Sequence, residues 1–240
     1  MANTRNLYSS KFIIISTVFW VIINLLSIYF LDEEISRWFR VASSLYFVIW
    51  SFSFGIFKSK MDYVLVSYLI CDISLVYYEI QVFNFITFLA RSLIFSLLIF
   101  IVFPKIRSVK FKFFELMLGI AVVAINIYLL FELLAMVPEA FIYDYFYPVY
   151  LALTLLTILL VGVAFTYNNI FSNKRSFYFL LAALFLALSD FNFFIAIYLD
   201  VPVFYYPDRF FHIFALGLLL LFWIKPIEDS NNNNLEQREV

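Results

Sequence analysis

Stretches of about twenty mostly apolar residues, the length that a helix needs to cross a bilayer, recur eight times along this chain of 240 residues. They cover residues 12–31, 38–57, 61–80, 82–103, 113–137, 143–167, 177–199 and 208–225. In lipid, only helices and closed barrels satisfy every backbone polar group. Apolar segments of this length therefore predict an all-α fold, a polytopic membrane bundle of about eight transmembrane helices.

The composition excludes several other classes of protein. Hydrophobic residues make up 65% of the chain and charged residues 14%, whereas soluble domains have about half and about a quarter. Too few polar side chains remain to cover a globule in water, which argues against a soluble enzyme or a disordered scaffold. A net charge of -1 argues against a nucleic-acid partner. With one cysteine, one histidine and four glycines, we expect no metal site and no cofactor.

The loop charges predict the orientation. Basic residues on the side of the two termini are Arg5, Lys11, Lys58, Lys60, Lys105, Arg107, Lys110, Lys112, Lys174, Arg175, Lys225 and Arg238. The other side holds Arg37, Arg40 and Arg209, beside acids such as Glu79, Glu139, Asp144 and Asp200. The positive-inside rule then places both termini in the cytoplasm, and we expect a bacterial inner membrane. Residues 1–227 form one transmembrane domain, and residues 228–240 form a polar tail that we expect to be disordered.

Three ionisable residues lie deep inside predicted spans. Asp72 is about 16 Å and Asp190 about 20 Å from the cytoplasmic ends of their helices, and Arg91 reaches a similar level. Each such charge costs about 2.5–3.5 kcal/mol to insert, so we expect all three to face one polar cavity. Two carboxylates around one cation can divide into a general acid and a general base, as hydrolysis of an acid-labile bond requires. The alternative is a structural salt bridge between Arg91 and one aspartate.

For the other polar residues, the sequence gives less reason to expect a function. His212 lies near the outer end of the last span, where an interfacial hydrogen-bonding role is favoured over a catalytic one. Asn126 and Asn192 either line the cavity or join one helix to another. Glu132 is placed to reach the headgroup region, and Arg209 is close enough to the interface to be solvated.

The positions of the two aspartates suggest an internal duplication. Asp72 and Asp190 each occupy the third span of a four-span half, and the two spans have the same predicted direction. Residues 68–72 and 186–190 would then be equivalent segments of two parallel four-helix halves. Arg91 and His212 would occupy the fourth helix of each half.

Three segments resemble motifs of the YhhN family, eight-helix membrane proteins that include the animal lysoplasmalogenases. Residues 182–190, AALFLALSD, resemble the family signature GAxxFxxSD. Residues 69–72 are similar to its SxxGD element, with Cys71 where glycine is usual. Residues 88–91 resemble FxxAH, with Arg91 where histidine is usual, and Arg40 takes the place of the lysine of a KP element.

The resemblance implies an integral membrane hydrolase with Asp72 and Asp190 as the catalytic pair. The implied reaction is hydrolysis of the vinyl ether of a lysoplasmalogen, so the expected partner is a lipid or lysophospholipid substrate. Arg91, Asn192 and His212 are expected to contact the substrate. The chain departs from the family at Arg91, at the lost proline of the KP element, and at residues 212–216, which replace the family's YxxAQ. It would thus be a divergent member, whose substrate need not be a plasmalogen.

A non-enzymatic function competes with this interpretation. Buried Asp and Arg residues serve proton relays equally well, so a proton-coupled transporter or a lipid-binding bundle is the alternative. The presence of only four glycines argues mildly against a transporter, because broken or closely packed transporter helices use Gly and Pro.

Overall fold

The computed structural model describes residues 2–53, 60–106, 113–137 and 146–224. Within these ranges the chain forms eight α-helices and a short 3-10 helix, and no strand. The helices are α1 (Ala2–Phe30), α2 (Glu33–Ser53), α3 (Lys60–Val76), α4 (Gln81–Ile106), α5 (Phe113–Ala135), α6 (Phe146–Phe171), α7 (Lys174–Tyr198) and α8 (Tyr205–Ile224), with the 3-10 helix η2 (Pro202–Phe204) before α8. The all-α prediction is confirmed for this part of the chain.

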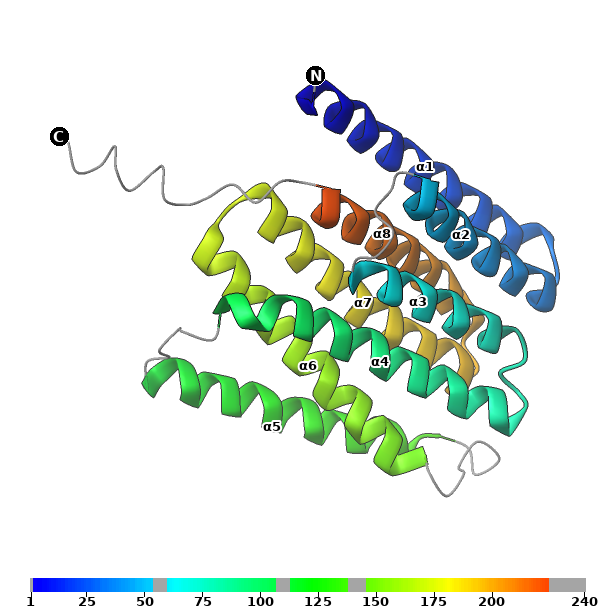
Figure 1. Ribbon diagram of the computed structural model, residues 1–240. Helices are drawn as coiled ribbons and strands as arrows, with labels where there is room; N and C mark the ends of the chain where they lie inside the picture. Colours follow the sequence, from blue (N-terminus) through cyan, green and yellow to red (C-terminus); the bar gives the residue numbers. More distant parts are fainter. Residues whose placement is uncertain (1, 54–59, 107–112, 138–145, 225–240) are drawn as a thin grey trace.

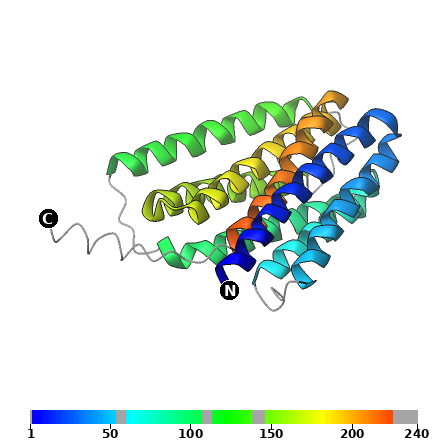
Figure 2. The ribbon, with the colours of Figure 1, turned by 90° about the horizontal axis from the view of Figure 1, so that it is seen from above.

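Consecutive helices run in alternating directions along one bundle (Figure 1). The start of α1 and the end of α8 consequently lie at the same end of the bundle. Helix α8 packs against α1, α2 and α7, while α3 lies between α2 and α4, and α6 contacts α4 and α7. Helix α5 packs against α6 at one edge of the bundle in both views (Figures 1 and 2). Residues from α2, α3, α7 and α8 can therefore meet in the interior.

Among the residues that the structure describes, five helical segments are long and apolar enough to cross a membrane. They are Ser10–Phe30, Gln81–Ile106, Phe146–Phe171, Lys174–Tyr198 and Pro202–Ile224. Helix α3 has only 17 residues, and α2 has a polar face. Neither is therefore both long and apolar enough to count among these segments. The chain has the helices of a membrane protein, while the count of eight spans and the two equivalent halves stay predictions. The polar tail 228–240 lies outside the described residues.

Several helices begin earlier than hydropathy predicts, α2 and α7 among them. Helix α7 begins at Lys174 because the Asn173 side chain accepts a hydrogen bond from the Ser176 backbone N–H at 2.8 Å, and the Ser176 hydroxyl accepts one from the Asn173 N–H at 3.1 Å. Helix α2 begins at Glu33, five residues before the predicted start at residue 38. The carboxylates of Glu33 and Glu34 in its first turn favour this start, since they face the positive end of the helix dipole.

The bundle is polar at selected interior positions and apolar outside. Helix α2 buries Ser36, Arg40, Ser43, Ser44 and Ser51, which share one face because their spacings follow the helical repeat. Large apolar side chains on the outer faces are exposed, with Ile15 in α1 at 67% as an example. An exposed apolar surface around buried polar groups suits a lipid environment.

Close packing of α1 against α8 depends on Gly217. A Cβ atom at this position would lie 2.2 Å from Oγ1 and 3.1 Å from Cβ of Thr17. The Thr17 hydroxyl is held by a 2.7 Å hydrogen bond to the Ile13 carbonyl. We expect Gly217→Ala to lower the free energy of unfolding by about 1–3 kcal/mol through overpacking, measured by denaturation in mixed micelles.

Gly162 in α6 provides the matched control, because a Cβ there would meet nothing within 4 Å. Gly162→Ala should leave stability unchanged or raise it slightly, since alanine favours the helix. Adding Thr17→Ala to Gly217→Ala should recover most of the loss. Equal effects of the two glycine substitutions would rule out this account of the α1–α8 contact.

Candidate functional site

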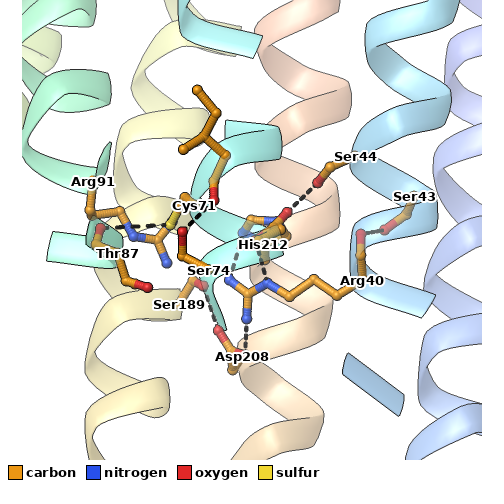
Figure 3. A network of polar contacts seen from close by, with 12 residues as sticks. Arg40, Ser43, Ser44, Cys71, Ser74, Thr87, Arg91, Ser189, Asp208 and His212 are labelled. Atoms are coloured by element: carbon orange, nitrogen blue, oxygen red, sulfur yellow. Dashed lines mark hydrogen bonds and ion pairs between the residues drawn. The ribbon is translucent and has the colours of Figure 1, made fainter. Parts of the chain in front are cut away.

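Arg40 is the centre of a buried polar network. Its Nε donates to Asp72 Oδ1 at 2.8 Å, and its Nη1 donates to Asp208 Oδ2 at 2.7 Å. Its Nη2 lies 3.0 Å from Nδ1 of His212. Figure 3 shows the Arg40 side chain extending from α2 so that its guanidinium group lies between His212 and Asp208. We call Arg40, Ser44, Asp72, Ser189, Asp208 and His212 the Arg40 network; they come from α2, α3, α7 and α8.

The contacts of His212 define its tautomer. A guanidinium group has only donors, so Nδ1 of His212 must accept from Arg40. The ring proton then sits on Nε2, which lies 3.0 Å from Asp72 Oδ2 and donates to it. His212 is therefore a neutral imidazole that uses both ring nitrogens inside the network.

Both carboxylates of the network are fully bonded. Asp72 accepts through Oδ1 from Arg40 and through Oδ2 from His212 and from the Ser44 hydroxyl. Asp208 accepts through Oδ2 from Arg40 and through Oδ1 from the Ser189 hydroxyl at 2.7 Å. Each oxygen thus has at least one donor, which is the condition for keeping a buried carboxylate ionised.

A second ion pair joins α4 to α7. Arg91 Nη2 lies 2.9 Å from Asp190 Oδ1. One further polar atom of each side chain is unused: Asp190 Oδ2 and Arg91 Nη1 are buried and have no hydrogen-bond partner among the described residues. We call Arg91, Asp190 and the neighbouring Tyr68 the open pair site, because the buried Tyr68 hydroxyl also has no partner in that part of the chain.

Tyr68 connects the two groups. Its ring meets the His212 ring edge to face, with centroids 5.6 Å apart. Its hydroxyl lies within electrostatic reach of Arg91 and Asp190. The open pair site and the Arg40 network are thus neighbours, and the Tyr68 ring contacts the network at His212.

The buried charges around the two groups balance. The Arg40 network has one positive charge, two negative charges and a neutral histidine, and the Arg91–Asp190 pair adds none. Arg209, which is 3% exposed and lies within electrostatic reach of Asp208 and Asp72, supplies the remaining positive charge. Three arginines and three aspartates therefore neutralise one another in this region. This balance offsets part of the cost of burying them.

The structure corrects the prediction that Asp72 and Asp190 share one cation. That these aspartates and Arg91 face one polar cavity stays a prediction. Asp72 pairs with Arg40 and Asp190 with Arg91, so each aspartate has its own cation. For Asp190, the alternative of a salt bridge to Arg91 is the arrangement present. The catalytic role of these residues stays a prediction.

Charges predicted at loops and interfaces are in fact buried. Arg40 is 2% exposed, Asp208 is 0% exposed, and Arg209 is buried instead of solvated. His212, expected at the interface, is also completely buried. The early start of α2 at Glu33 explains the burial of Arg40, since Arg40 then lies about two turns inside the helix. The polar face of α2 was the sequence signal that could have placed Arg40 in the interior.

The asparagines do not join the site. Asn192 is buried, but its Nδ2 donates to the Leu188 carbonyl of its own helix at 2.6 Å. Asn126 likewise donates to the Val122 carbonyl at 2.9 Å, on an exposed face of α5. Glu132 is exposed on the same helix. Neither asparagine has a contact that supports the predicted cavity lining.

In the ranges that the structure describes, no group of three or more His, Cys, Asp or Glu side chains is arranged to hold a metal ion. Comparison of the chain with protein-family models, with curated proteins and with solved structures finds no match.

Proposed function

We propose that the chain is an integral membrane hydrolase of a lipid ether, with Asp190 as the reacting carboxyl group. The observation that carries this proposal is Asp190 Oδ2, which is buried and has no partner among the described residues. Asp72 and Asp208, in contrast, use both of their oxygens within the Arg40 network. The resemblance of residues 182–190, which end at Asp190, to the YhhN signature supports the same assignment.

A vinyl ether suits a single available carboxyl group. Asp190 first takes up a proton from water on Oδ2 and then transfers it to the alkene carbon farther from the ether oxygen, which leaves an oxocarbenium ion and a carboxylate. Water adds to the cationic carbon while Asp190 accepts the proton that the water releases. The resulting hemiacetal breaks its carbon–oxygen bond, giving a fatty aldehyde and the free glycerol hydroxyl. Asp190 thus recovers the proton that it transferred.

The other atoms of the open pair site have complementary roles. Arg91 Nη1, a donor without a partner in the described chain, is available to an ether or phosphate oxygen of the substrate. The Tyr68 hydroxyl, also unpartnered there, can orient the attacking water. Asp72, whose oxygens are both bonded, acts as a positioning residue: it holds His212, against which Tyr68 packs.

The proposed orientation has both termini in the cytoplasm of a bacterium. Lys60, Lys105 and Lys174 belong to helix ends on the side of the bundle where α1 starts and α8 ends, and Lys11 lies in the half of α1 nearer to that side. Basic residues at one end favour the cytoplasmic face.

The proposal is tested on purified protein in nanodiscs, with empty nanodiscs as the blank. Incubation with a lysoplasmenyl phospholipid should release fatty aldehyde and glycerophospho-headgroup in equal amounts, quantified by mass spectrometry. The double variant Asp72→Asn/Asp190→Asn should release neither above the blank. Unchanged substrate with the wild type, together with pH-driven solute flux in proteoliposomes, would overturn the hydrolase in favour of the transporter.

A further inference from the structure

A pocket at the outer end of the bundle holds a second set of unused donors. It lies between α1, α2 and the start of α8, at the end of the bundle opposite to the start of α1 and the end of α8. Its volume is about 370 Å³, and its lining includes Glu33, Ser36, Tyr205, Tyr206 and Arg209. None of the residues of the open pair site lines it. The pocket is therefore a different site from the one proposed for hydrolysis.

Arg209 is the residue of this pocket whose unpaired donors indicate a ligand. Its side chain is buried, yet Nε and Nη1 have no hydrogen-bond partner within the described chain. A guanidinium group presents its donors in a planar fork that matches the oxygens of phosphate, and buried donors without partners are costly. The first turn of α8 also lies at the pocket, so the positive end of its dipole favours an anion there.

Glu33 restricts which anion fits. Its side chain is 53% exposed and lines the pocket, and its Oε1 accepts from Arg37 at 2.6 Å and from the Tyr205 hydroxyl at 2.7 Å. These two bonds fix the carboxylate in place. A ligand with net negative charge is repelled by it, whereas a ligand that also carries an ammonium group is attracted.

The surroundings of the pocket fit a lipid. Ile28, Leu31 and Val203 line it together with the polar residues, and Leu31 and Val203 are exposed. Two tyrosines, Tyr205 and Tyr206, also line it, as is usual where a membrane protein meets the headgroup layer. Polar and apolar lining thus meet at one site, as the headgroup and glycerol of a phospholipid require.

We propose that this pocket binds the headgroup of a zwitterionic phospholipid. The phosphate accepts hydrogen bonds from Arg209, and the ammonium group lies toward Glu33. Phosphate itself is available from a lipid or from solution, and the experiment separates these sources.

The test measures binding to purified protein in detergent by native mass spectrometry. The probes are a short-chain phosphatidylcholine, the matching phosphatidylglycerol and inorganic phosphate. We expect phosphatidylcholine to bind at least about tenfold more tightly than phosphatidylglycerol, and inorganic phosphate more weakly than either, since one charged contact is worth about that factor. Arg209→Met should weaken the binding of both lipids by about tenfold or more. Lys60→Gln, at the other end of the bundle, is the control and should leave the binding of both lipids unchanged.

A second variant keeps the test decisive if Arg209→Met does not fold. Glu33→Gln changes an exposed side chain and retains an oxygen for Arg37 and Tyr205. It should reduce the preference for phosphatidylcholine over phosphatidylglycerol toward equality. Equal binding of the two lipids to the wild type would overturn the proposal. So would inorganic phosphate binding as tightly as phosphatidylcholine, because the site would then be one for a free anion.

Discussion

Replacing Arg40 with methionine is expected to lower the free energy of unfolding by about 3–5 kcal/mol, or to prevent folding. The substitution leaves the carboxylates of Asp72 and Asp208 without their cation at fully buried positions. It also removes the donor that fixes the tautomer of His212. The measurement is chemical denaturation in mixed micelles, followed by circular dichroism.

Arg37→Met is the matched control for this prediction. Arg37 lies one turn earlier in α2, but its partners Glu33 and Glu79 are 53% and 64% exposed. Exposed ion pairs contribute about 0–1 kcal/mol, so a correspondingly small loss is expected. The triple variant Arg40→Met/Asp72→Asn/Asp208→Asn, which removes the buried charges together, should recover much of the stability. An Arg40→Met loss no larger than that of Arg37→Met would contradict the Arg40 network as described.

Asp190→Asn is expected to lower aldehyde release by about 10²- to 10⁴-fold, the contribution typical of a general acid or base. Asparagine preserves an oxygen for Arg91 but cannot carry the proton that the reaction needs. The measurement is the initial rate of aldehyde formation from a lysoplasmenyl phospholipid, at equal amounts of folded protein.

Two further variants separate chemistry from folding. Asp62→Asn changes another buried aspartate, which is bonded to Ser51 in the other half of α3 from Asp72, and should retain wild-type activity. Arg91→Met/Asp190→Asn removes both charges of the pair, so it should be more stable than Asp190→Asn alone and remain inactive. If Asp190→Asn keeps more than about a tenth of the wild-type rate, Asp190 is not the proton donor.

Hydropathy predicted most of the fold because it detects the length of apolar segments. The predicted spans 12–31, 82–103 and 143–167 overlap α1, α4 and α6 over most of their lengths. It does not detect where a helix begins, since that depends on polar residues at the end. Asn173 and Ser176 set the start of α7, and the acidic first turn favours the early start of α2.

The candidate site was only partly predictable, for a related reason. Asp72, Arg91 and Asp190 were recognisable from sequence because each is a charge in the middle of an apolar span. Arg40 and Asp208 lie near predicted span ends, where a charged residue is ordinarily solvated. Which arginine pairs with which aspartate depends on the rotation of each helix about its axis and on its neighbours. A hydropathy profile contains no information on the rotation of a helix or on which helices are its neighbours.

The most direct test of the proposed function is the reaction in D₂O, with the aldehyde product examined by mass spectrometry. Proton transfer from Asp190 to the alkene carbon predicts one deuterium on the carbon next to the aldehyde group when the wild-type protein acts on a lysoplasmenyl phospholipid. Asp190→Asn should form this product about 10²- to 10⁴-fold more slowly than the wild type. Wild-type protein that releases no aldehyde, or aldehyde without deuterium at that carbon, would contradict the proposed function.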